Sequence, residues 1–215
     1  MKPLLVLAAF PVVFMGWASC SHSGTGHAAL PDPRAVDKSV PEYKNPFHPS
    51  TYAHFVARKD YRKTYDVYKD DTLLNRQPKK SRKIFVCLDE QRGQYLVDGL
   101  VAMDFPLSSG VKAYPTKTGD YTVISKKEDH ASNLYGKMYD AEGKCINYNA
   151  ESTDPIPEGG RFDGSPMPYW QRLTNAGLGL HVGKVRRHPV SHGCVRLPRN
   201  VAEILYRQTS IGTPV

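Results

Sequence analysis

The sequence has little cysteine and lacks the signatures of several protein classes. After residue 17 no apolar run is long enough to cross a bilayer, so no transmembrane span is expected there. No segment repeats another, which argues against a repeat architecture. The zinc motifs CxxC and HExxH are both missing. Only four cysteines occur in 215 residues, at positions 20, 87, 145 and 194.

Acidic residues are also few relative to basic ones. The chain has 29 Lys and Arg against 21 Asp and Glu, which gives a formal net charge of +8. A basic protein can meet anionic lipid, anionic wall polymer or nucleic acid, or its charge can serve solubility alone. The export signal described next argues against nucleic acid as the partner.

The first residues predict export from the cytoplasm. After Lys2, residues 4–17 form an apolar run that is too short to span a bilayer but fits the core of a signal peptide. Ala18-Ser19-Cys20 resembles the lipobox of bacterial lipoproteins, although Trp17 stands where Leu is usual. We therefore expect residues 1–19 to be a signal peptide and Cys20 to carry lipid, which would anchor the protein to a membrane in the periplasm. An ordinary secretory signal without lipid is the alternative.

The segment between this signal and residue 84 predicts no large core. Residues 20–41 are rich in Ser, Gly, Ala, His and Pro and predict a flexible linker after the lipidated cysteine. Residues 42–83 form an N-terminal extension. In it tyrosines 61, 65 and 68 fall at helical spacing, which indicates a short helix packed on the main domain.

From residue 84 to residue 215 the pattern indicates a mainly β domain with one or two short helices and long loops. Asp98-Gly99 favours a tight hairpin, and polar residues 126–168 predict long loops with little regular structure, as in a functional lid. Val201, Ile204 and Leu205 give one face of a helix, with Pro198 in its first turn. Strands are predicted at 84–88, 94–97, 100–105, 121–124 and 178–181, and a last one begins at 213.

The main candidate for chemistry is Ser191-His192-Gly193-Cys194. A thiol beside an imidazole can become a thiolate at neutral pH, and the thiolate is the nucleophile. The glycine permits a backbone bend whose N–H groups can stabilise an oxyanion. His181 ends a predicted strand and can approach the sulfur from the side. We therefore expect His181, rather than His192, to be the principal base.

Two other interpretations of these residues compete with this one. Cys194 can be a small core residue with surface histidines around it. A metal site is disfavoured because His188 would have to join His181, His192 and Cys194 from a flexible loop. No metal and no cofactor are expected. Of the remaining cysteines, Cys87 and Cys145 can pair in an oxidising envelope, or Cys87 can be a buried unpaired thiol.

The sequence resembles the YkuD-type L,D-transpeptidase family in several motifs. SHGCVRLP at 191–198 follows GLGLHVG at 177–183 and MPYW at 167–170. FPLSSGVKAYPTKTGDYTV at 105–123 and GTPV at 212–215 are similar to further family stretches in the same order, except that Lys117 replaces a common proline. The resemblance runs from about residue 84 to residue 215.

This resemblance implies a β-sandwich-like catalytic domain that acts on peptidoglycan. It implies that Cys194 attacks the carbonyl of the third residue of a tetrapeptide stem, that D-Ala leaves, and that an amine resolves the thioester. It places His181 as the base, with His192 and Gly193 in the site. With water as acceptor the protein would be an L,D-carboxypeptidase; attachment of a protein, or a silent peptidoglycan-binding module, are further possibilities.

The resemblance also implies substrate contacts. Ser191 matches a position that shapes the site, and the Arg196 fork can hold a substrate carboxylate or bond loop carbonyls. Tyr169 and Trp170 can wall the peptide groove or simply pack in the core. The sequence leaves open the stem's third residue, the acceptor and the oligomeric state.

Overall fold

The structure, a computed structural model, describes residues 32–77 and 81–215, all within one unit of the chain. The predicted signal peptide, Cys20 and residues 21–31 of the predicted linker lie outside the described residues. Within the described ranges, no helix is long and apolar enough to cross a membrane. The predicted boundaries at residues 42 and 84 stay predictions.

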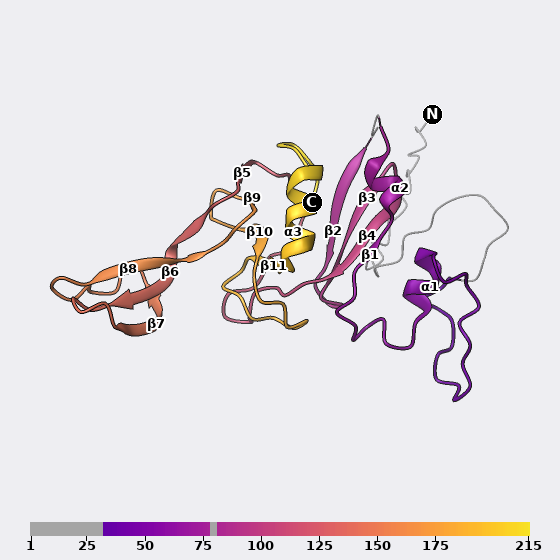
Figure 1. The fold of residues 1–215 in the computed structure, drawn as a ribbon, viewed down its shortest axis with the longest axis horizontal. Helices are drawn as coiled ribbons and strands as arrows, with labels where there is room; N and C mark the ends of the chain where they lie inside the picture. Colours follow the sequence, from indigo (N-terminus) through magenta and orange to yellow (C-terminus); the bar gives the residue numbers. More distant parts are fainter. Residues whose placement is uncertain (1–31, 78–80) are drawn as a thin grey trace, which may run out of the picture. The chain divides into compact units, whose positions relative to one another are not determined.

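The first sheet has four antiparallel strands in the order β1-β4-β3-β2 (Figure 1). Asp98 and Gly99 join β3 to β4 with φ values of 51° and 79°, the left-handed conformation that a tight hairpin needs. The strands predicted from residue 84 to residue 105 are therefore confirmed. The strand bounds are β1 (Tyr68–Lys69), β2 (Arg82–Cys87), β3 (Arg92–Val97) and β4 (Leu100–Pro106).

The second sheet has the order β11-β10-β9-β5 and is followed by α3 (Arg199–Gln208), the longest helix in the described residues. The predicted strand ending at His181 is confirmed as β10. The predicted C-terminal helix is also confirmed, although Pro198 is its N-cap rather than a residue of its first turn. The strand bounds are β5 (Ser125–Lys127), β9 (Trp170–Arg172), β10 (Gly179–Val182) and β11 (Val195–Leu197).

The stretch predicted as a strand at 121–124 makes only an isolated bridge. Thr122 bridges to Pro214, and Tyr121 and Val215 exchange two backbone hydrogen bonds of 2.9 and 2.8 Å. The chain end predicted to begin a strand thus closes against this stretch.

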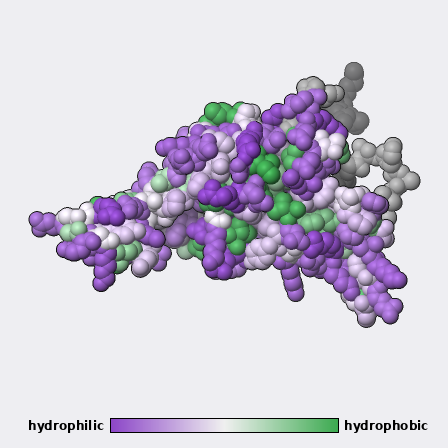
Figure 2. All heavy atoms as spheres, viewed as in Figure 1, coloured by the Kyte–Doolittle hydropathy of each residue, from purple (hydrophilic) through white to green (hydrophobic). Residues whose placement is uncertain are grey.

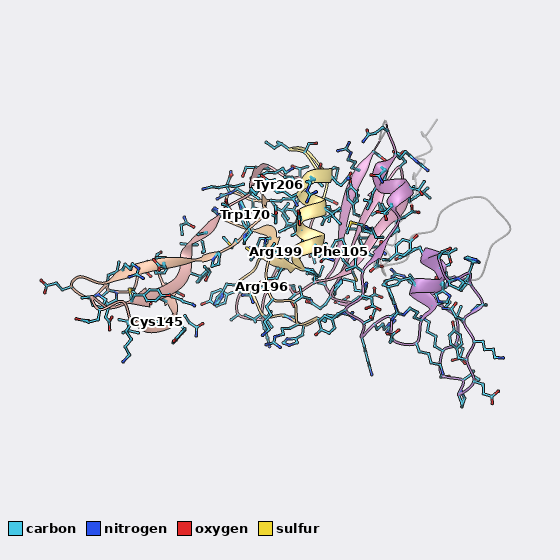
Figure 3. The ribbon with its side chains drawn as sticks, in the orientation of Figure 1. Phe105, Cys145, Trp170, Arg196, Arg199 and Tyr206 are labelled. Atoms are coloured by element: carbon cyan, nitrogen blue, oxygen red, sulfur yellow. The ribbon has the colours of Figure 1, made fainter. Side chains whose placement is uncertain are left out.

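One hydrophobic core joins the two sheets and α3. Its fully buried members come from the first sheet (Ile84, Tyr95, Phe105), from the second sheet (Leu180, Leu197) and from α3 (Val201, Leu205). Figure 3 shows Phe105 beside α3. The mainly β fold predicted from the sequence is therefore confirmed, with three helices in the described residues.

A third sheet corrects the prediction that residues 126–168 are loops. Its strands run in the order β7-β6-β8 and extend away from the core (Figure 1). Figure 2 shows mostly hydrophilic residues over it, so its strands lack the apolar alternation that marks a half-buried sheet. Two glycines let the strands approach: a Cβ on Gly136 would lie 2.1 Å from Asp163 O, and one on Gly164 would lie 1.9 Å from Ser132 O. The strands are β6 (Ala131–Tyr139), β7 (Cys145–Glu151) and β8 (Arg161–Pro166).

The helix predicted from the spacing of Tyr61, Tyr65 and Tyr68 is wrong. Tyr61 lies in a turn, Tyr65 lies in an extended connection without regular structure, and Tyr68 begins β1. The extension instead forms two short helices, α1 (Tyr52–Ala57) and α2 (Asp71–Asn75), capped by the side chains of Thr51 and Asp70.

The extension attaches to the first sheet at a buried ion pair between strands β3 and β4. Arg92 Nε lies 2.5 Å from Asp104 Oδ1, with side-chain exposures of 2% and 0%. The hydroxyls of Tyr52 and Tyr61 donate to Asp104 Oδ2 at 2.7 and 2.8 Å. Tyr61 thus belongs to this network, whereas the hydroxyl of the exposed Tyr65 donates to Arg186 O at 3.1 Å, so the tyrosines share no helix face.

Cys145 carries a free thiol that donates to Asn147 O at 3.7 Å. It therefore does not pair with Cys87, which is buried in β2. The sequence left open a Cys87–Cys145 disulfide or a buried Cys87, and the structure shows Cys87 buried.

Candidate active site

The parallel pairing of β10 with β11 brings the two main candidate residues to one place. His181 lies opposite Arg196 in this register, and Cys194 immediately precedes β11. The Cys194 Sγ lies 3.4 Å from Gly177 O, just before β10. Residues 13 apart in sequence thus lie at neighbouring parallel strands, two register positions apart.

The Cys194 thiol is partly enclosed. Burial raises its pKa, and the backbone N–H of Gly179 and the charge of Arg196 act in the opposite direction without reversing the shift. The thiol is therefore protonated at neutral pH, whereas the sequence allowed a thiolate formed beside the imidazole. Its proton must be removed during the reaction.

His181 is a buried imidazole with a fixed orientation. It is 6% exposed, and its Nδ1 lies 2.7 Å from Val182 O. Because a carbonyl oxygen only accepts hydrogen bonds, Nδ1 carries the proton and Nε2 keeps its lone pair. Burial lowers the pKa of His181 to about 4, which leaves the ring neutral at pH 7.

Ser191 shapes the bend that presents the thiol. Its hydroxyl donates to Cys194 O at 2.5 Å and accepts from the N–H of Gly193 at 3.2 Å. Gly193 has a φ of 111°, a conformation that favours glycine. The Ser191 side chain is therefore a brace inside the loop, and at 2% exposed it is not open to a ligand.

A second loop, residues 110–116, forms hydrogen bonds to this bend. The Thr116 hydroxyl donates to Gly193 O at 2.6 Å and accepts from the Gly110 N–H at 2.8 Å. Val111 N–H donates to Ser191 O at 2.9 Å. A Cβ on Gly110 would lie 2.8 Å from the Gly193 Cα, so only glycine fits against the bend. Thr116, Gly110 and Val111 were not predicted as site residues, although they lie in the stretch 105–123 that resembles the family.

His192 faces an aromatic cluster. Its ring stacks on Tyr135 of β6, with centroids 4.4 Å apart and planes 21° apart. The Tyr114 ring lies 4.8 Å from it. His192 thus connects the bend to the third sheet, and Tyr135 is a site residue for which the sequence pattern held no signal.

The three remaining candidates lie in different settings. The aliphatic part of Arg196 packs where a Cβ on Gly183 would be, and its guanidinium makes no hydrogen bond to another described residue. Trp170 is 3% exposed and its ring lies 5.9 Å from that of His181. Tyr169 packs against Tyr206 of α3 at 5.6 Å and is not part of the cavity lining.

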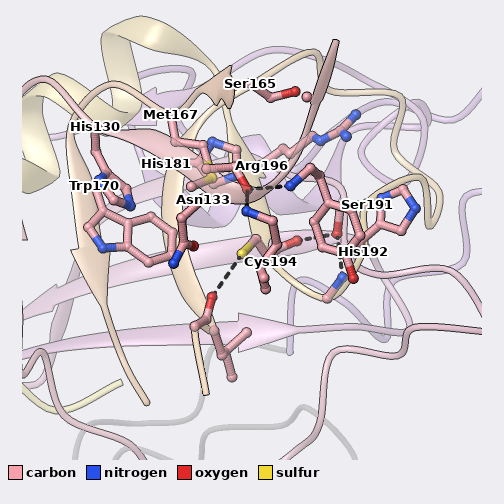
Figure 4. A pocket seen from close by; sticks show the side chains of 18 of the residues that line it. His130, Asn133, Ser165, Met167, Trp170, His181, Ser191, His192, Cys194 and Arg196 are labelled. Carbon is pink, nitrogen blue, oxygen red and sulfur yellow. Dashed lines mark hydrogen bonds between the residues drawn. The ribbon is translucent and has the colours of Figure 1, made fainter. Parts of the chain in front are cut away.

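Apart from Tyr169, the predicted catalytic and substrate-binding residues border a cavity of about 720 Å³ (Figure 4). Its walls are the 170–184 segment, the 191–196 segment and the third sheet. In Figure 4 Cys194, His181, Asn133 and Trp170 lie around the same space. Among residues 32–77 and 81–215, no three His, Cys, Asp or Glu side chains are arranged to hold a metal ion.

Comparison with known proteins identifies the family of the chain. Residues 81–215 match the family model of the YkuD L,D-transpeptidase catalytic domain. The chain therefore belongs to this family, whose domain is that of a transpeptidase, a transferase enzyme.

Individual relatives are more distant. "Probable L,D-transpeptidase 3" of Mycobacterium tuberculosis is 32% identical over 117 residues, which are 51% of this chain and 36% of that protein. The chain thus spans about a third of that relative. An L,D-transpeptidase from Mycobacterium smegmatis aligns with 62% of this chain and 57% of its own at 22% identity and a TM-score of 0.48. One from Stackebrandtia nassauensis aligns with 76% and 64% at 22% identity and a TM-score of 0.47.

Proposed function

We propose that this chain is a cysteine acyltransferase that transfers peptidoglycan stem peptides to an amine acceptor. The observation that carries the proposal is the thiol of Cys194 at a cavity bordered by the neutral, oriented imidazole of His181. A nucleophile and a base in one cavity are what acyl transfer requires.

In the first half-reaction the Cys194 Sγ attacks the carbonyl of the third stem residue. His181 Nε2 takes the thiol proton and passes it to the departing D-Ala amine. This order of events fits a thiol with a raised pKa and an imidazole with a lowered one, because neither group is charged beforehand.

The Cys194 N–H is available to the tetrahedral oxyanion. It donates no hydrogen bond to another described residue, whereas the N–H of Gly193 is engaged by Ser191. A backbone donor next to the nucleophile is the usual means of stabilising such an oxyanion.

The basic residues around the cavity favour an anionic acyl donor. Four lysines and arginines border the cavity, namely Lys117, Arg172, Lys184 and Arg196. A stem peptide carries carboxylates, and the unpartnered guanidinium of Arg196 suits one of them. We further propose that the chain is exported and that lipid on Cys20 anchors it in the periplasm.

The test is mass spectrometry of disaccharide tetrapeptides incubated with the purified protein. Cross-linked dimers with loss of one D-Ala per link support the proposal, and tripeptides alone indicate a carboxypeptidase. Cys194→Ser should lower either product on the order of a thousandfold while the circular dichroism spectrum is unchanged. Unaltered substrate with wild-type protein would indicate a silent binding module and contradict the proposal.

A further inference from the structure

The cavity has one acidic side chain among its lining residues. Glu151, at the end of β7, faces a lining whose other charged members are four lysines and arginines. Those cations suit the carboxylates of the donor stem. They leave Glu151 with no evident part in binding that donor, because like charges repel.

Glu151 borders the same cavity as Cys194, Tyr135 and His192. The β6–β7 register places it directly opposite Tyr135, whose ring stacks on His192. Burial, followed by the charges of Glu151, Tyr114 and Cys194, raises the pKa of the Tyr135 phenol. Glu151 and Cys194 therefore both lie close enough to act on this phenol.

Hydrogen bonds fix the backbone of Glu151, whereas its carboxylate is available to a ligand. Its N–H donates to Asp154 Oδ2 at 2.9 Å, and the Asp154 N–H donates to Glu151 O at 3.0 Å. The side chain is exposed and, within the described part of the chain, its carboxylate forms no hydrogen bond or ion pair.

We propose that Glu151 binds the ammonium group of the acyl acceptor and holds it beside the thioester on Cys194. This inference rests on the proposed function. An alkyl amine is protonated at neutral pH, and the four cations of the cavity repel it. A carboxylate opposite Tyr135 supplies the compensating attraction and a charge-assisted hydrogen bond.

The second half-reaction balances with this group in place. One ammonium proton leaves first and frees the nitrogen lone pair; the nitrogen then forms a bond to the acyl carbon, the C–S bond breaks, and its electron pair returns to sulfur. Of the three ammonium protons, the amide keeps one, the Cys194 sulfur receives one through His181, and one leaves to solvent past Glu151.

The experiment compares two nucleophiles on the full-length protein. The donor is a disaccharide tetrapeptide, and the acceptors are Nα-acetyl-L-lysine amide, which is cationic, and hydroxylamine, which is uncharged at neutral pH. Mass spectrometry gives the ratio of each adduct to the hydrolysed tripeptide. Glu151→Gln should lower the lysine-amide ratio about tenfold and leave the hydroxylamine ratio unchanged.

Glu158→Gln is the matched control, because Glu158 is an exposed acid between β7 and β8 that does not border the cavity. It should leave both ratios at the wild-type value. Unchanged ratios in Glu151→Gln, or an equal fall in both, would overturn ammonium binding while the proposed function stands. Absence of D-Ala release by the wild-type protein would overturn the proposed function and this inference together.

Discussion

The imidazole of His181 is oriented by the carbonyl of its own neighbour, Val182, at 2.7 Å from Nδ1. A carbonyl fixes the tautomer as a carboxylate would, but it carries no net charge to stabilise an imidazolium. Burial lowers the pKa of the ring, so it stays neutral well below the pH at which a free histidine gains a proton. This relationship sets the pH range in which the proposed base can work.

We predict that acylation of Cys194 by a carbapenem, measured by mass spectrometry, keeps a constant rate as pH falls from about 7 to about 5.5. Below that the rate should fall with an apparent pKa of about 4, the value for His181. His181→Ala should lower the rate on the order of a hundredfold or more, whereas His192→Ala should lower it much less.

An acid limb near the ordinary histidine value of 6.5 would contradict this prediction. Short reaction times are needed at low pH. Because the folded-state pKa of His181 is lowered, its contribution to stability is present above 6.5 and is lost as pH falls toward 4. Circular dichroism at each pH separates unfolding from loss of the base.

The second prediction concerns the Cys194 thiol itself. Burial raises its pKa above the ordinary 9.0, so alkylation by iodoacetamide should be slow at neutral pH and still increase above pH 9. The rate is measured on the peptide that contains Cys194, with the Cys145 peptide as an internal reference. A rate that levels off near neutral pH would show a thiolate–imidazolium pair instead.

The elements that were predictable from the sequence are those with a local signal. Asp98-Gly99 specifies its hairpin through backbone conformation, and Val201 and Leu205 specify α3 through spacing. His181 and Cys194 were found through motifs that lie only 13 residues apart. In each case the residues that specify the feature lie close together in the sequence.

The missed features depend on contacts distant in sequence or on exposed strands. Tyr61 is held by Asp104, 43 residues away, and Thr116 supports Gly193 from 77 residues away. The third sheet is largely solvated, so burial left no alternating pattern in residues 126–168 and Tyr135 gave no signal. In the sequence Gly136 indicates a loop, but in the fold it allows two strands to approach closely.

The third prediction tests the buried pair of Arg92 and Asp104. Asp104→Asn would leave the Arg92 charge buried without its partner, so the free energy of unfolding should fall by about 3–5 kcal/mol. Urea unfolding measures this change. The exposed pair of Arg207 and Glu203 is the control, and Glu203→Gln should change stability by less than about 1 kcal/mol. Equal effects of the two substitutions would contradict the assigned role of the buried pair.

The fourth prediction concerns Cys20, which follows the apolar run of residues 4–17. In cells, Cys20→Ala should move the protein from the membrane fraction to the soluble periplasmic fraction, because a lipid chain supplies the attachment. Immunoblots of the fractions and mass spectrometry of the N-terminal peptide provide the measurement. Unchanged fractionation together with an unacylated N-terminal peptide would show that the anchor is wrong.

The last prediction concerns the contact of Gly110 with the bend at Gly193. A Cβ at Gly110 would lie 2.1 Å from Tyr114 O and 2.8 Å from the Gly193 Cα, and both neighbours are backbone atoms that cannot rotate away. Gly110→Ala should therefore displace the bend that carries Cys194. A displacement near 1 Å can lower a rate about a hundredfold, so we expect carbapenem acylation to slow by about ten- to a hundredfold.

Loss of stability alone must be separated from this effect. Gly143 lies between β6 and β7, with a φ of 80° and open space around its Cβ position. Gly143→Ala should therefore cost backbone strain of about 1–3 kcal/mol without touching the bend. Acylation rates and urea unfolding are measured for both variants. Slow acylation in Gly110→Ala, with a normal rate in Gly143→Ala at a similar loss of stability, would place the effect at the bend. A normal rate in Gly110→Ala would show that the bend tolerates the displacement and that Gly110 does not position the nucleophile.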